Sequence, residues 1–393
     1  MKYKLSDLFE KPISGEWGNE IKEGTKGAKV LRTTNFTNLG RLDLSDIVER
    51  EIDLIKHKDK TLKKGDIIIE KSGGSPTQPV GRVVIFDIDE KEPYFCNNFT
   101  SILRPTDKLY PKYSLYLMKR LYDIRKVLKF QNQTTGIINL KLNDYISKTE
   151  VDIPSLEVQE KIANTLDKSQ KLMDKRKEQI EALDELVKSR FIEMFGNLKD
   201  EKHLALNKCT NFIDYRGKTP TLSDTGIRMI NAKSVGNGVF KYIDEYISEE
   251  TYNSWMKRGF PMAGDVLFVT EGHTFGNVCR IPDDLNKFAM GQRVITMQGN
   301  KGIINNAFLA QYMQTNAFKI KIDKYKTGSS AQGIRSKELQ KILIPIPQIE
   351  LQNKFEDFVK KVDKLKLEMK TSLKELEDNF NSLMQRAFKG ELF

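Results

Sequence analysis

The chain has 393 residues, of which 39% are apolar and 30% charged, and its net charge is +11. This length predicts two or more domains with packed cores, and no apolar run approaches the roughly 18 residues of a membrane span. No apolar stretch follows the charged N-terminal residues as in a signal peptide, so we expect a soluble, cytoplasmic protein. Cys96, Cys209 and Cys279 lie far apart, which argues against disulfides and structural zinc and favours small buried or half-buried thiols.

Residues 1–153 have the pattern of a globular domain that mixes strands and helices. Within them, a Gly-Asp turn at Gly65-Asp66 precedes an apolar strand at 67–69. Polar segments occur at 32–35, 71–78 and 129–136. We expect these three segments to be loops at the surface.

A single long helix is predicted in residues 154–197, because neither proline nor glycine occurs from Val158 to Phe195. At about 1.5 Å per residue, some 38 residues would span about 57 Å. Positions spaced alternately by four and three are mostly apolar: Ile162, Leu166, Ser169, Met173, Arg176, Ile180, Leu183, Val187, Arg190 and Met194. A narrow apolar stripe between charged faces predicts a coiled-coil seam.

Residues 198–347 repeat the organisation of residues 1–153. The Gly-Asp turn and its strand recur at 261–269, and the strand at 29–35 recurs at 228–234, in both cases 199 residues later. The strand, proline and helix start at 151–162 recur 193 residues later at 344–355. Several matches in one order, with nearly one spacing, indicate an internal duplication.

A second long helix is predicted in residues 348–393. Its seam positions are Phe355, Val359, Val362, Lys366, Met369, Leu373, Leu376, Phe380, Leu383 and Ala387. We expect the two helices to pair antiparallel around an approximate twofold axis; the alternative is that each packs on its own domain. The predicted fold class is α+β, with two tandem mixed α/β domains joined by two long helices that form an antiparallel coiled coil.

The basic excess lies in residues 1–153 and 198–347, whereas 154–197 and 348–393 are nearly neutral. This distribution favours a polyanion that is contacted at two places.

Three motifs resemble those of type I restriction–modification specificity subunits, and the resemblance covers nearly the whole chain. They are the strand-proline-helix segment 151–162, the segment Leu186–Gly196 that closes the first helix, and Ala387–Phe393. The Gly-Asp strand units at 65–69 and 264–268 also match the pattern of that family. At 353–355 the chain has Asn-Lys-Phe, where the family more often has an acidic or basic residue followed by isoleucine.

The resemblance implies that residues 1–153 and 198–347 are target-recognition domains, each reading one half of a split DNA site, and that the spacer helices set the unread gap. It implies two modification subunits that bind S-adenosylmethionine and methylate adenine, and restriction subunits that use ATP with Mg as a further partner class. We expect no cofactor and no metal in this chain itself.

The sequence motifs also argue against a catalytic centre in this chain. We find no G-x-x-x-x-G-K-[ST] phosphate loop, no Gly-rich cofactor fingerprint, and no Asn-Pro-Pro-aromatic or Asp-Pro-Pro-aromatic run. The histidines, His57, His203 and His273, lack metal-ligand spacing. Asp66 and Glu70 could suggest a nuclease carboxylate pair, but the repeat has Val269 in place of the second acid, so we interpret Asp66 as a turn residue.

Base reading needs Arg, Lys, Asn, Gln, Ser and Thr on loops that reach a groove, with Lys and Arg beside them for phosphates. The candidate DNA-binding residues in the first domain are Arg32, Thr34, Asn35, Lys71, Ser72, Ser75, Thr77, Gln78, Lys129, Gln131, Gln133 and Thr134. Those in the second are Arg216, Lys218, Asn231, Lys233, Thr270, His273, Thr274, Lys326, Thr327, Ser329, Gln332 and Arg335. The corresponding loops of the two domains differ in sequence. This difference is expected if the domains share one fold but read different half-sites.

Phe191, Phe195, Phe380 and Phe388, near the helix ends, are candidates for docking the modification subunits. Two other functions stay open. A fused nuclease or methyltransferase would need a cofactor motif that we do not find. A non-DNA-binding coiled-coil adaptor would explain the helices, but not two basic domains with polar loops.

Overall fold

The structure is a computed structural model. It describes residues 2–21, 26–75, 77–89, 92–134, 137–217, 219–328 and 332–393. The chain divides into two compact units, and each combines one globular domain with parts of both long helices. Unit 1 is Met1–Arg176 with Ser372–Phe393, and unit 2 is Lys177–Thr371. Unit 1 is therefore built from two separate stretches of the chain.

Each unit contains an antiparallel four-stranded sheet with the same order of strands. In unit 1 the order is β2 (Ile13–Ser14), β9 (Thr100–Leu103), β5 (Ile67–Glu70) and β7 (Val83–Ile85). In unit 2 it is β14 (Thr210–Asp214), β20 (Val294–Gly299), β17 (Val266–Val269) and β18 (Val278–Arg280). The apolar strands β5 and β17 are fully buried, because a layer covers each of their faces.

Two smaller sheets also recur. One contains β4 (Val48–Arg50), β3 (Ala28–Leu31) and β8 (Tyr94–Cys96) in unit 1, and β16 (Tyr246–Ile247), β15 (Ile227–Ile230) and β19 (Ala289–Met290) in unit 2. The other pairs β1 (Lys2–Lys4) with β12 (Glu150–Asp152), and β13 (His203–Ala205) with β21 (Leu343–Pro345). The segments that match in sequence thus form equivalent strands, which confirms the predicted duplication.

The Gly-Asp turn starts the central strand in both units. Gly65 and Gly264 have φ values of 95° and 84°, a left-handed conformation that glycine adopts without steric cost. The Asp66 carboxylate accepts hydrogen bonds from the backbone N–H of Lys63 at 2.8 Å and from the Arg104 guanidinium. The predicted turn role of Asp66 is confirmed.

Short helices complete each unit. They are η1 (Leu5–Asp7), η2 (Thr33–Asn35), η3 (Lys58–Lys60), α1 (Pro111–Asp123), η4 (Lys126–Phe130) and α2 (Leu142–Lys148) in unit 1, and α4 (Leu206–Cys209), η5 (Ala232–Ser234), α5 (Glu249–Trp255), α6 (Asn306–Met313), α7 (Asn316–Asp323) and α8 (Ser336–Lys341) in unit 2. Pro111 occupies the first turn of α1, where a missing N–H costs nothing. Helix α1 packs on β5 and β7, and α6 packs on β17, β18 and β20.

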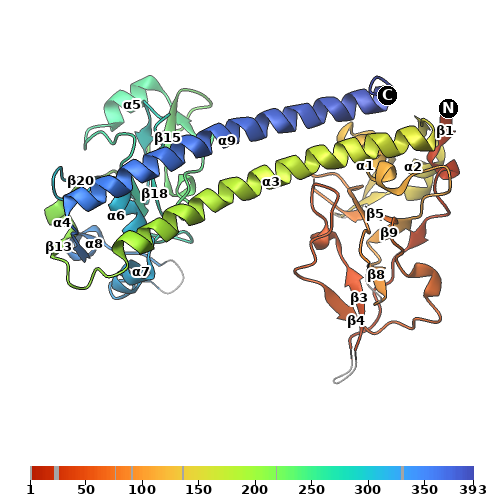
Figure 1. The fold of residues 1–393 in the computed structure, drawn as a ribbon, viewed down its shortest axis with the longest axis horizontal. Coiled ribbons are helices and arrows are strands. Elements are labelled where there is room, and N and C mark those ends of the chain that lie inside the picture. The colour runs from red at the N-terminus through yellow and green to blue at the C-terminus, as the bar shows by residue number, and fades with distance from the viewer. Residues whose placement is uncertain are drawn as a thin grey trace. The chain divides into compact units, whose positions relative to one another are not determined.

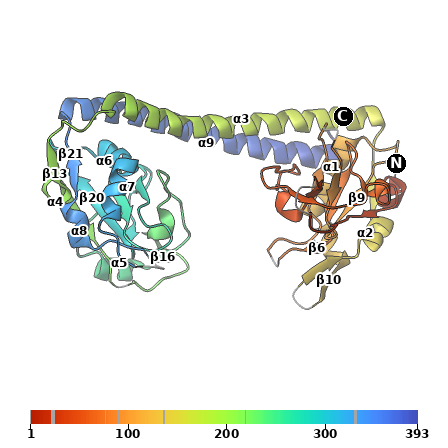
Figure 2. The same ribbon diagram turned by 90° about the horizontal axis from the view of Figure 1, so that it is seen from below.

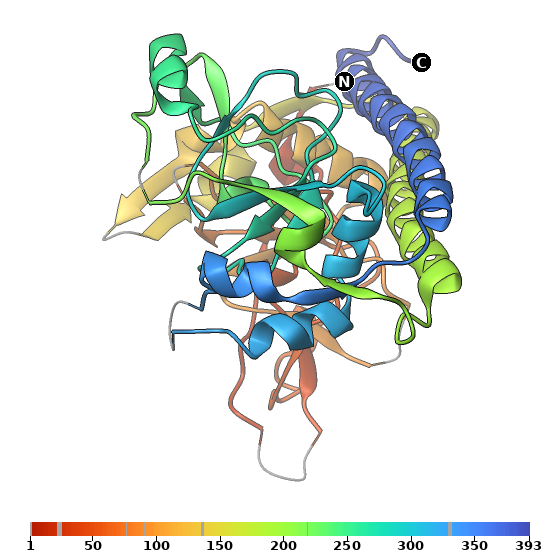
Figure 3. The same cartoon turned by 90° about the vertical axis from the view of Figure 1, so that its left-hand side faces the viewer.

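The two predicted spacer helices are α3 (Leu156–Phe195) and α9 (Ile349–Lys389). Every predicted seam position of both helices is buried or half-buried. In unit 1, Ile162 near the start of α3 shares a core with Ala387 near the end of α9. In unit 2, Phe191 near the end of α3 meets Phe355 near the start of α9, with ring centroids 5.5 Å apart. The helices therefore pair antiparallel, and Figure 3 shows their unit 2 ends side by side.

The helices also pack on the globular domains, which was the alternative expectation. In unit 1 the Tyr116 hydroxyl of α1 donates to Asp167 of α3 at 2.6 Å, and α1 lies beside α3 in Figure 1. In unit 2, Arg280 of β18 forms an ion pair with Asp363 of α9. One polar seam position, Lys366, pairs with Asp184 on the opposite helix. Each helix thus has one face for its partner and one for the adjoining domain.

Candidate DNA interface

In unit 1, two of the predicted polar segments form a single sheet. The segment 71–78 contains β6 (Ser72–Gly73), and 129–136 contains β10 (Gln131–Thr134), which pairs with β11 (Ile137–Leu140). Strand β11 also pairs with β6, so all three strands lie side by side (Figure 2). The backbone N–H of Leu140 donates to the carbonyl of Lys71 at 2.8 Å.

Unit 2 joins its corresponding segments in the same way. The backbone N–H of Ile334 donates to the carbonyl of Thr270 at 2.9 Å, and Gly272 N–H donates to the carbonyl of Gln332 at 2.9 Å. Thr327 and Gly333 exchange two backbone hydrogen bonds of 2.9 Å. Each unit therefore brings together two polar segments that are about 60 residues apart in sequence, here called the paired loops (71–78 with 129–136, and 270–277 with 324–332).

Many of the candidate side chains are accessible. Those of Thr34, Thr77, Lys129, Lys233, His273, Thr274, Thr327, Gln332 and Arg335 are exposed, and those of Arg32, Lys71, Ser72, Ser75, Gln78, Gln131, Arg216, Asn231 and Lys326 are half-buried. Lys218 and Ser329 lie outside the described residues, and only the backbone of Gln133 and Thr134 is described. The exposed group has the donors and acceptors that base edges and phosphates require.

Two candidates are corrected by their burial. Asn35 is 2% exposed; its amide donates to the carbonyls of Asp43 and Asp46 at 2.9 Å each, and its oxygen accepts from Arg32 N–H at 2.8 Å. It fixes its own loop and has no free polar atom for a base. Thr270 is fully buried, and its hydroxyl donates to the carbonyl of Arg293 at 3.3 Å.

Two half-buried candidates, Arg32 and Arg216, are held by neighbouring acids. Arg32 pairs with Asp46 at 2.7 Å. Arg216 chelates Asp214 through Nε and Nη2 at 2.9 and 2.7 Å. Burial pushes the pKa of Asp214 up, but hydrogen bonds from Arg216 more than offset this and leave the pKa below its usual value. Arg216 is thus oriented by a charged partner, which sequence spacing alone does not reveal.

Asn231 and Lys233 share one carboxylate, that of Glu245. Asn231 donates to it at 2.6 Å, and Lys233 forms a closer hydrogen bond. The Lys233 hydrogen bond lowers the pKa of Glu245 below its usual value, so the acid is charged at neutral pH. Lys71 makes a different contact, because its ammonium donates to the Ser14 hydroxyl, and burial lowers the pKa of Lys71.

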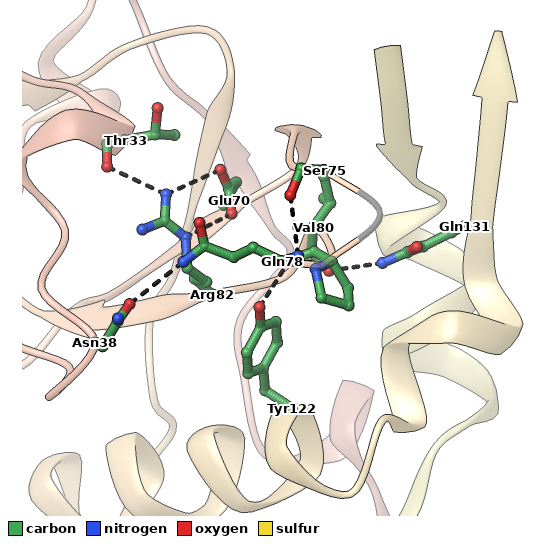
Figure 4. Close-up of polar contacts among 10 residues, drawn as sticks. Thr33, Asn38, Glu70, Ser75, Gln78, Val80, Arg82, Tyr122 and Gln131 are labelled. Atoms are coloured by element: carbon green, nitrogen blue, oxygen red, sulfur yellow. Dashed lines mark hydrogen bonds and ion pairs between the residues drawn. The ribbon is translucent and has the colours of Figure 1, made fainter. Parts of the chain in front are cut away.

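A cavity of about 240 Å³ lies beside the first paired loop of unit 1, lined in part by Asn38, Gln78, Arg82, Tyr122 and Arg125. Figure 4 shows the Arg82 guanidinium donating two hydrogen bonds to the Glu70 carboxylate, at 3.0 and 3.2 Å. It also donates to the carbonyl of Thr33 at 3.3 Å. Gln78 donates to Asn38 at 3.3 Å across the same space. Arg82 thereby ties the segment 32–35 to the strand that leads into the paired loops.

The sequence does not indicate Arg82 as part of this interface, because it lies outside every polar segment. Its partner Glu70 is 2% exposed and would be a costly buried charge without the guanidinium. A buried acid at the end of an apolar strand is the one signal that could have indicated such an arginine. In unit 2 the equivalent residue is Val269, which is uncharged, so no arginine is required to balance a buried acid there.

The four phenylalanines proposed as docking residues serve the units' own cores. Phe191 and Phe195 are 4% and 3% exposed and pack against Phe308. In unit 1, Phe388 contacts the Tyr113 ring and Phe380 the Tyr116 ring, at 5.3 and 6.4 Å between centroids. Docking by these residues would require exposed rings, but Phe191 and Phe195 are buried and Phe380 and Phe388 are half-buried. The apolar stripe of each helix end is covered by α1 or α6 as well as by the other long helix.

Among the described residues, no group of three or more His, Cys, Asp or Glu side chains could hold a metal ion. No helix in the described part of the chain is long and apolar enough to cross a membrane.

A family model described as the type I restriction modification DNA specificity domain matches residues 1–182 and 213–378. Because these matches cover most of the chain, the chain belongs to this family.

Individual relatives agree with this family assignment. The specificity subunit of the type I restriction enzyme EcoKI from Escherichia coli strain K12 is 22% identical over 394 aligned residues, covering 92% of this chain and 82% of that protein. The specificity subunit of MjaVIII from Methanocaldococcus jannaschii is 24% identical over 312 residues, covering 73% of this chain and 70% of that protein. The crystal structure of a type I restriction-modification S subunit from M. genitalium has the same fold, with a TM-score of 0.56 and 18% identity over 99% of this chain and 96% of that one.

Proposed function

We propose that this DNA-specificity subunit reads a split DNA site, with one half-site for the globular domain of each unit. The observation that carries the proposal is the repeated architecture of the paired loops. Both units join two polar loops at the end of equivalent strands, yet the loops differ in sequence. One fold that presents two sets of side chains suits the reading of two different base sequences.

The charge of the chain supports this proposal. The net charge of +11 is concentrated in residues 1–153 and 198–347, which form the globular domains. Three exposed cations lie at these loops: Lys129 within a paired loop, Lys233 within the segment 231–234, and Arg335 just after a paired loop. Lysine and arginine next to base-reading side chains supply the phosphate contacts that hold a protein in register on DNA.

The proposal assigns the spacer role to α3 and α9. Each is about 40 residues long and lacks an internal proline or glycine, so each is a stiff element. An antiparallel pair of such helices fixes the separation of two reading surfaces more precisely than a loop does. The length of the pair then sets the number of unread base pairs between the half-sites.

The partners follow from the family. In the proposal two modification subunits, which bind S-adenosylmethionine and methylate adenine, assemble on this chain, and restriction subunits that use ATP with Mg form a further partner class. This chain contributes recognition and scaffolding and no catalytic residue.

A methylome tests the proposal directly. The chain is expressed with its neighbouring modification subunit in a host free of adenine methylation, and N6-methyladenine is mapped by long-read sequencing. We expect two short specific sequences around a fixed unread gap. A continuous motif contradicts reading by two domains, and no methylation by a soluble, associated complex favours the adaptor function instead.

A further inference from the structure

The turn that precedes β9 in unit 1, and its equivalent before β20 in unit 2, lie next to the paired loops. The sheet registers make the equivalence explicit, since Thr100 pairs with Glu70 and Val294 pairs with Val269. The residues just before these strand starts are therefore equivalent. They are Phe99 in unit 1 and Arg293 in unit 2.

Both residues anchor the start of a paired loop through their backbone. The carbonyl of Phe99 accepts hydrogen bonds from the N–H groups of Lys71 and Ser72, at 2.9 and 3.2 Å. The carbonyl of Arg293 accepts from the N–H of Thr270 at 2.9 Å and from its hydroxyl at 3.3 Å. The side chains of Phe99 and Arg293 are therefore attached to backbone that is hydrogen-bonded directly to the first residues of a paired loop.

Both side chains are exposed, although their chemistry differs completely. The Phe99 side chain is a large apolar group with 49% exposure, which folding alone does not require. The Arg293 side chain is 57% exposed and touches Glu271 of the paired loop, with Nε 3.5 Å from the carboxylate. This ion pair is exposed and contributes little to stability, but it shows that the Arg293 guanidinium lies beside a side chain of the paired loop.

Arg293 also has a strained backbone. Its φ of 65° lies in the left-handed region, which among the described non-glycine residues only Arg125 shares. Residues other than glycine lose stability in that conformation, and they persist there where the side chain has a role. Glycine would remove the strain and keep the carbonyl that holds Thr270. An arginine at this position therefore points to a function of its side chain.

We propose that Phe99 and Arg293 are specificity-determining residues, each of which contacts a base edge of the half-site read by its own unit. Arginine is suited to the two acceptors of guanine in the major groove, and phenylalanine to the methyl group of thymine. The proposal rests on the proposed function, since it names which side chains at the interface distinguish the two half-sites. It adds a residue pair that the polar segments of the sequence did not indicate.

The experiment uses the methylome of the assembled complex with Phe99→Ala and Arg293→Ala variants. Phe99→Ala should relax the motif only in the half-site read by unit 1, at one or two positions, and Arg293→Ala only in the other half. The unaltered half-site serves as an internal control for folding. Matched controls are Ile55→Ala, an exposed apolar residue of unit 1, and Lys301→Ala, an exposed cation beyond the far end of β20; neither should change the motif.

Two further variants separate base reading from a structural or purely electrostatic role. Arg293→Lys keeps the charge but not the planar fork, so it should relax the motif as Arg293→Ala does. Arg293→Gly should raise the thermal unfolding midpoint by about 2 °C while it still relaxes the motif.

An unchanged motif in Phe99→Ala and Arg293→Ala complexes, with the wild-type split motif intact, would overturn this inference and leave the proposed function standing. A wild-type complex without a split motif would overturn the proposed function and the inference together.

Discussion

Gln159 and Gln352 make the same three hydrogen bonds, one set in each unit. The Gln159 side chain accepts from the backbone N–H of Tyr110 at 2.9 Å and donates to the carbonyls of Lys108 and Pro154 at 3.0 Å each. Both glutamines are buried, and each lies in the first turns of its long helix. Their amides attach the start of α3 and of α9 to the globular domain.

Replacing Gln352 by leucine should therefore destabilise unit 2. The change leaves the N–H of Asn305 and the carbonyls of Ile303 and Pro347 without their partners at 3.0, 3.0 and 2.8 Å. Buried groups without hydrogen bonds cost about 1–3 kcal/mol each, so a loss of about 3 kcal/mol is expected in urea unfolding. The exposed Gln385→Ala on the same helix is the control. Equal stability of the two variants would show that the amide network does not hold α9.

Asp66 and Asp265 are equivalent turn carboxylates with different partners. Asp66 faces Arg104 in a bidentate pair at 2.9 and 2.8 Å, whereas Asp265 accepts from the neutral amide of Gln298 at 2.7 Å. Asp66→Asn leaves a largely buried arginine unpaired and should cost about 3–5 kcal/mol. Asp265→Asn keeps the turn and should cost less than about 1 kcal/mol at pH 7. Urea titrations of both variants measure the difference, and similar losses would contradict the assigned roles of the partners.

The same site predicts a pH dependence. Burial raises the pKa of Asp265 above its usual value, so the folded state holds the proton more tightly than the unfolded chain. The stabilisation from that protonation is present at low pH and is lost as the pH rises through the raised pKa. The stability of the wild type relative to Asp265→Asn should thus fall as the pH rises from the ordinary aspartate pKa, about 4, through the raised pKa of Asp265. A constant difference over this range would exclude the raised pKa.

The three cysteines should be unreactive in the folded protein. All are buried, and burial raises the pKa of Cys96 and Cys209 to about 11 and that of Cys279 to about 12. Thiolate is the reactive form, so it is scarce and inaccessible at pH 8. A disulfide reagent such as DTNB should react with no thiol before urea is added and with three afterwards. Fast reaction of any thiol without urea would show that its site opens readily.

The helix pair can be shortened without changing its seam. Deleting one heptad from each helix, residues 175–181 and 367–373, keeps every remaining seam position in phase. Seven residues correspond to about 10.5 Å, or roughly three base-pair steps. The methylome of this variant should show the original half-sites around a gap shortened by about three. Altered half-sites, or an unchanged gap, would contradict the spacer role.

Repetition and periodicity made the architecture predictable. A duplicated strand and turn occur with nearly one spacing, and a 4-3 stripe defines which side of α3 and α9 is covered, so both follow from the chain alone. The tertiary partners did not follow. Asn35 has the composition of a base reader, but the acceptors that bury it, the carbonyls of Asp43 and Asp46, cannot be located from sequence.

The candidate interface shows the same limit. The sequence indicated two polar loops in each domain, and the structure shows that β11 joins them in unit 1 through pairing of residues about 65 positions apart. Phe99 could not be predicted as an interface residue, because an isolated aromatic side chain is usually a core residue. Arg293 could not be predicted either, because the sequence does not reveal its positive φ. Phe191 and Phe195 were misjudged for the opposite reason: aromatic residues at a helix end look exposed until α6 is placed against them.

The division of unit 1 between two distant stretches has a consequence for how the chain folds on the ribosome. Residues 1–176 emerge long before 372–393, so Tyr113 and Tyr116 can contact Phe388 and Phe380 only after all of unit 2 has been synthesised. Unit 2 is continuous in sequence and can close first, although it emerges second. A stop codon between unit 2 and residue 380 would then leave the globular domain of unit 1 with an uncovered apolar surface on α1. Nascent chains should depend on chaperones most in the interval before residues 372–393 are made.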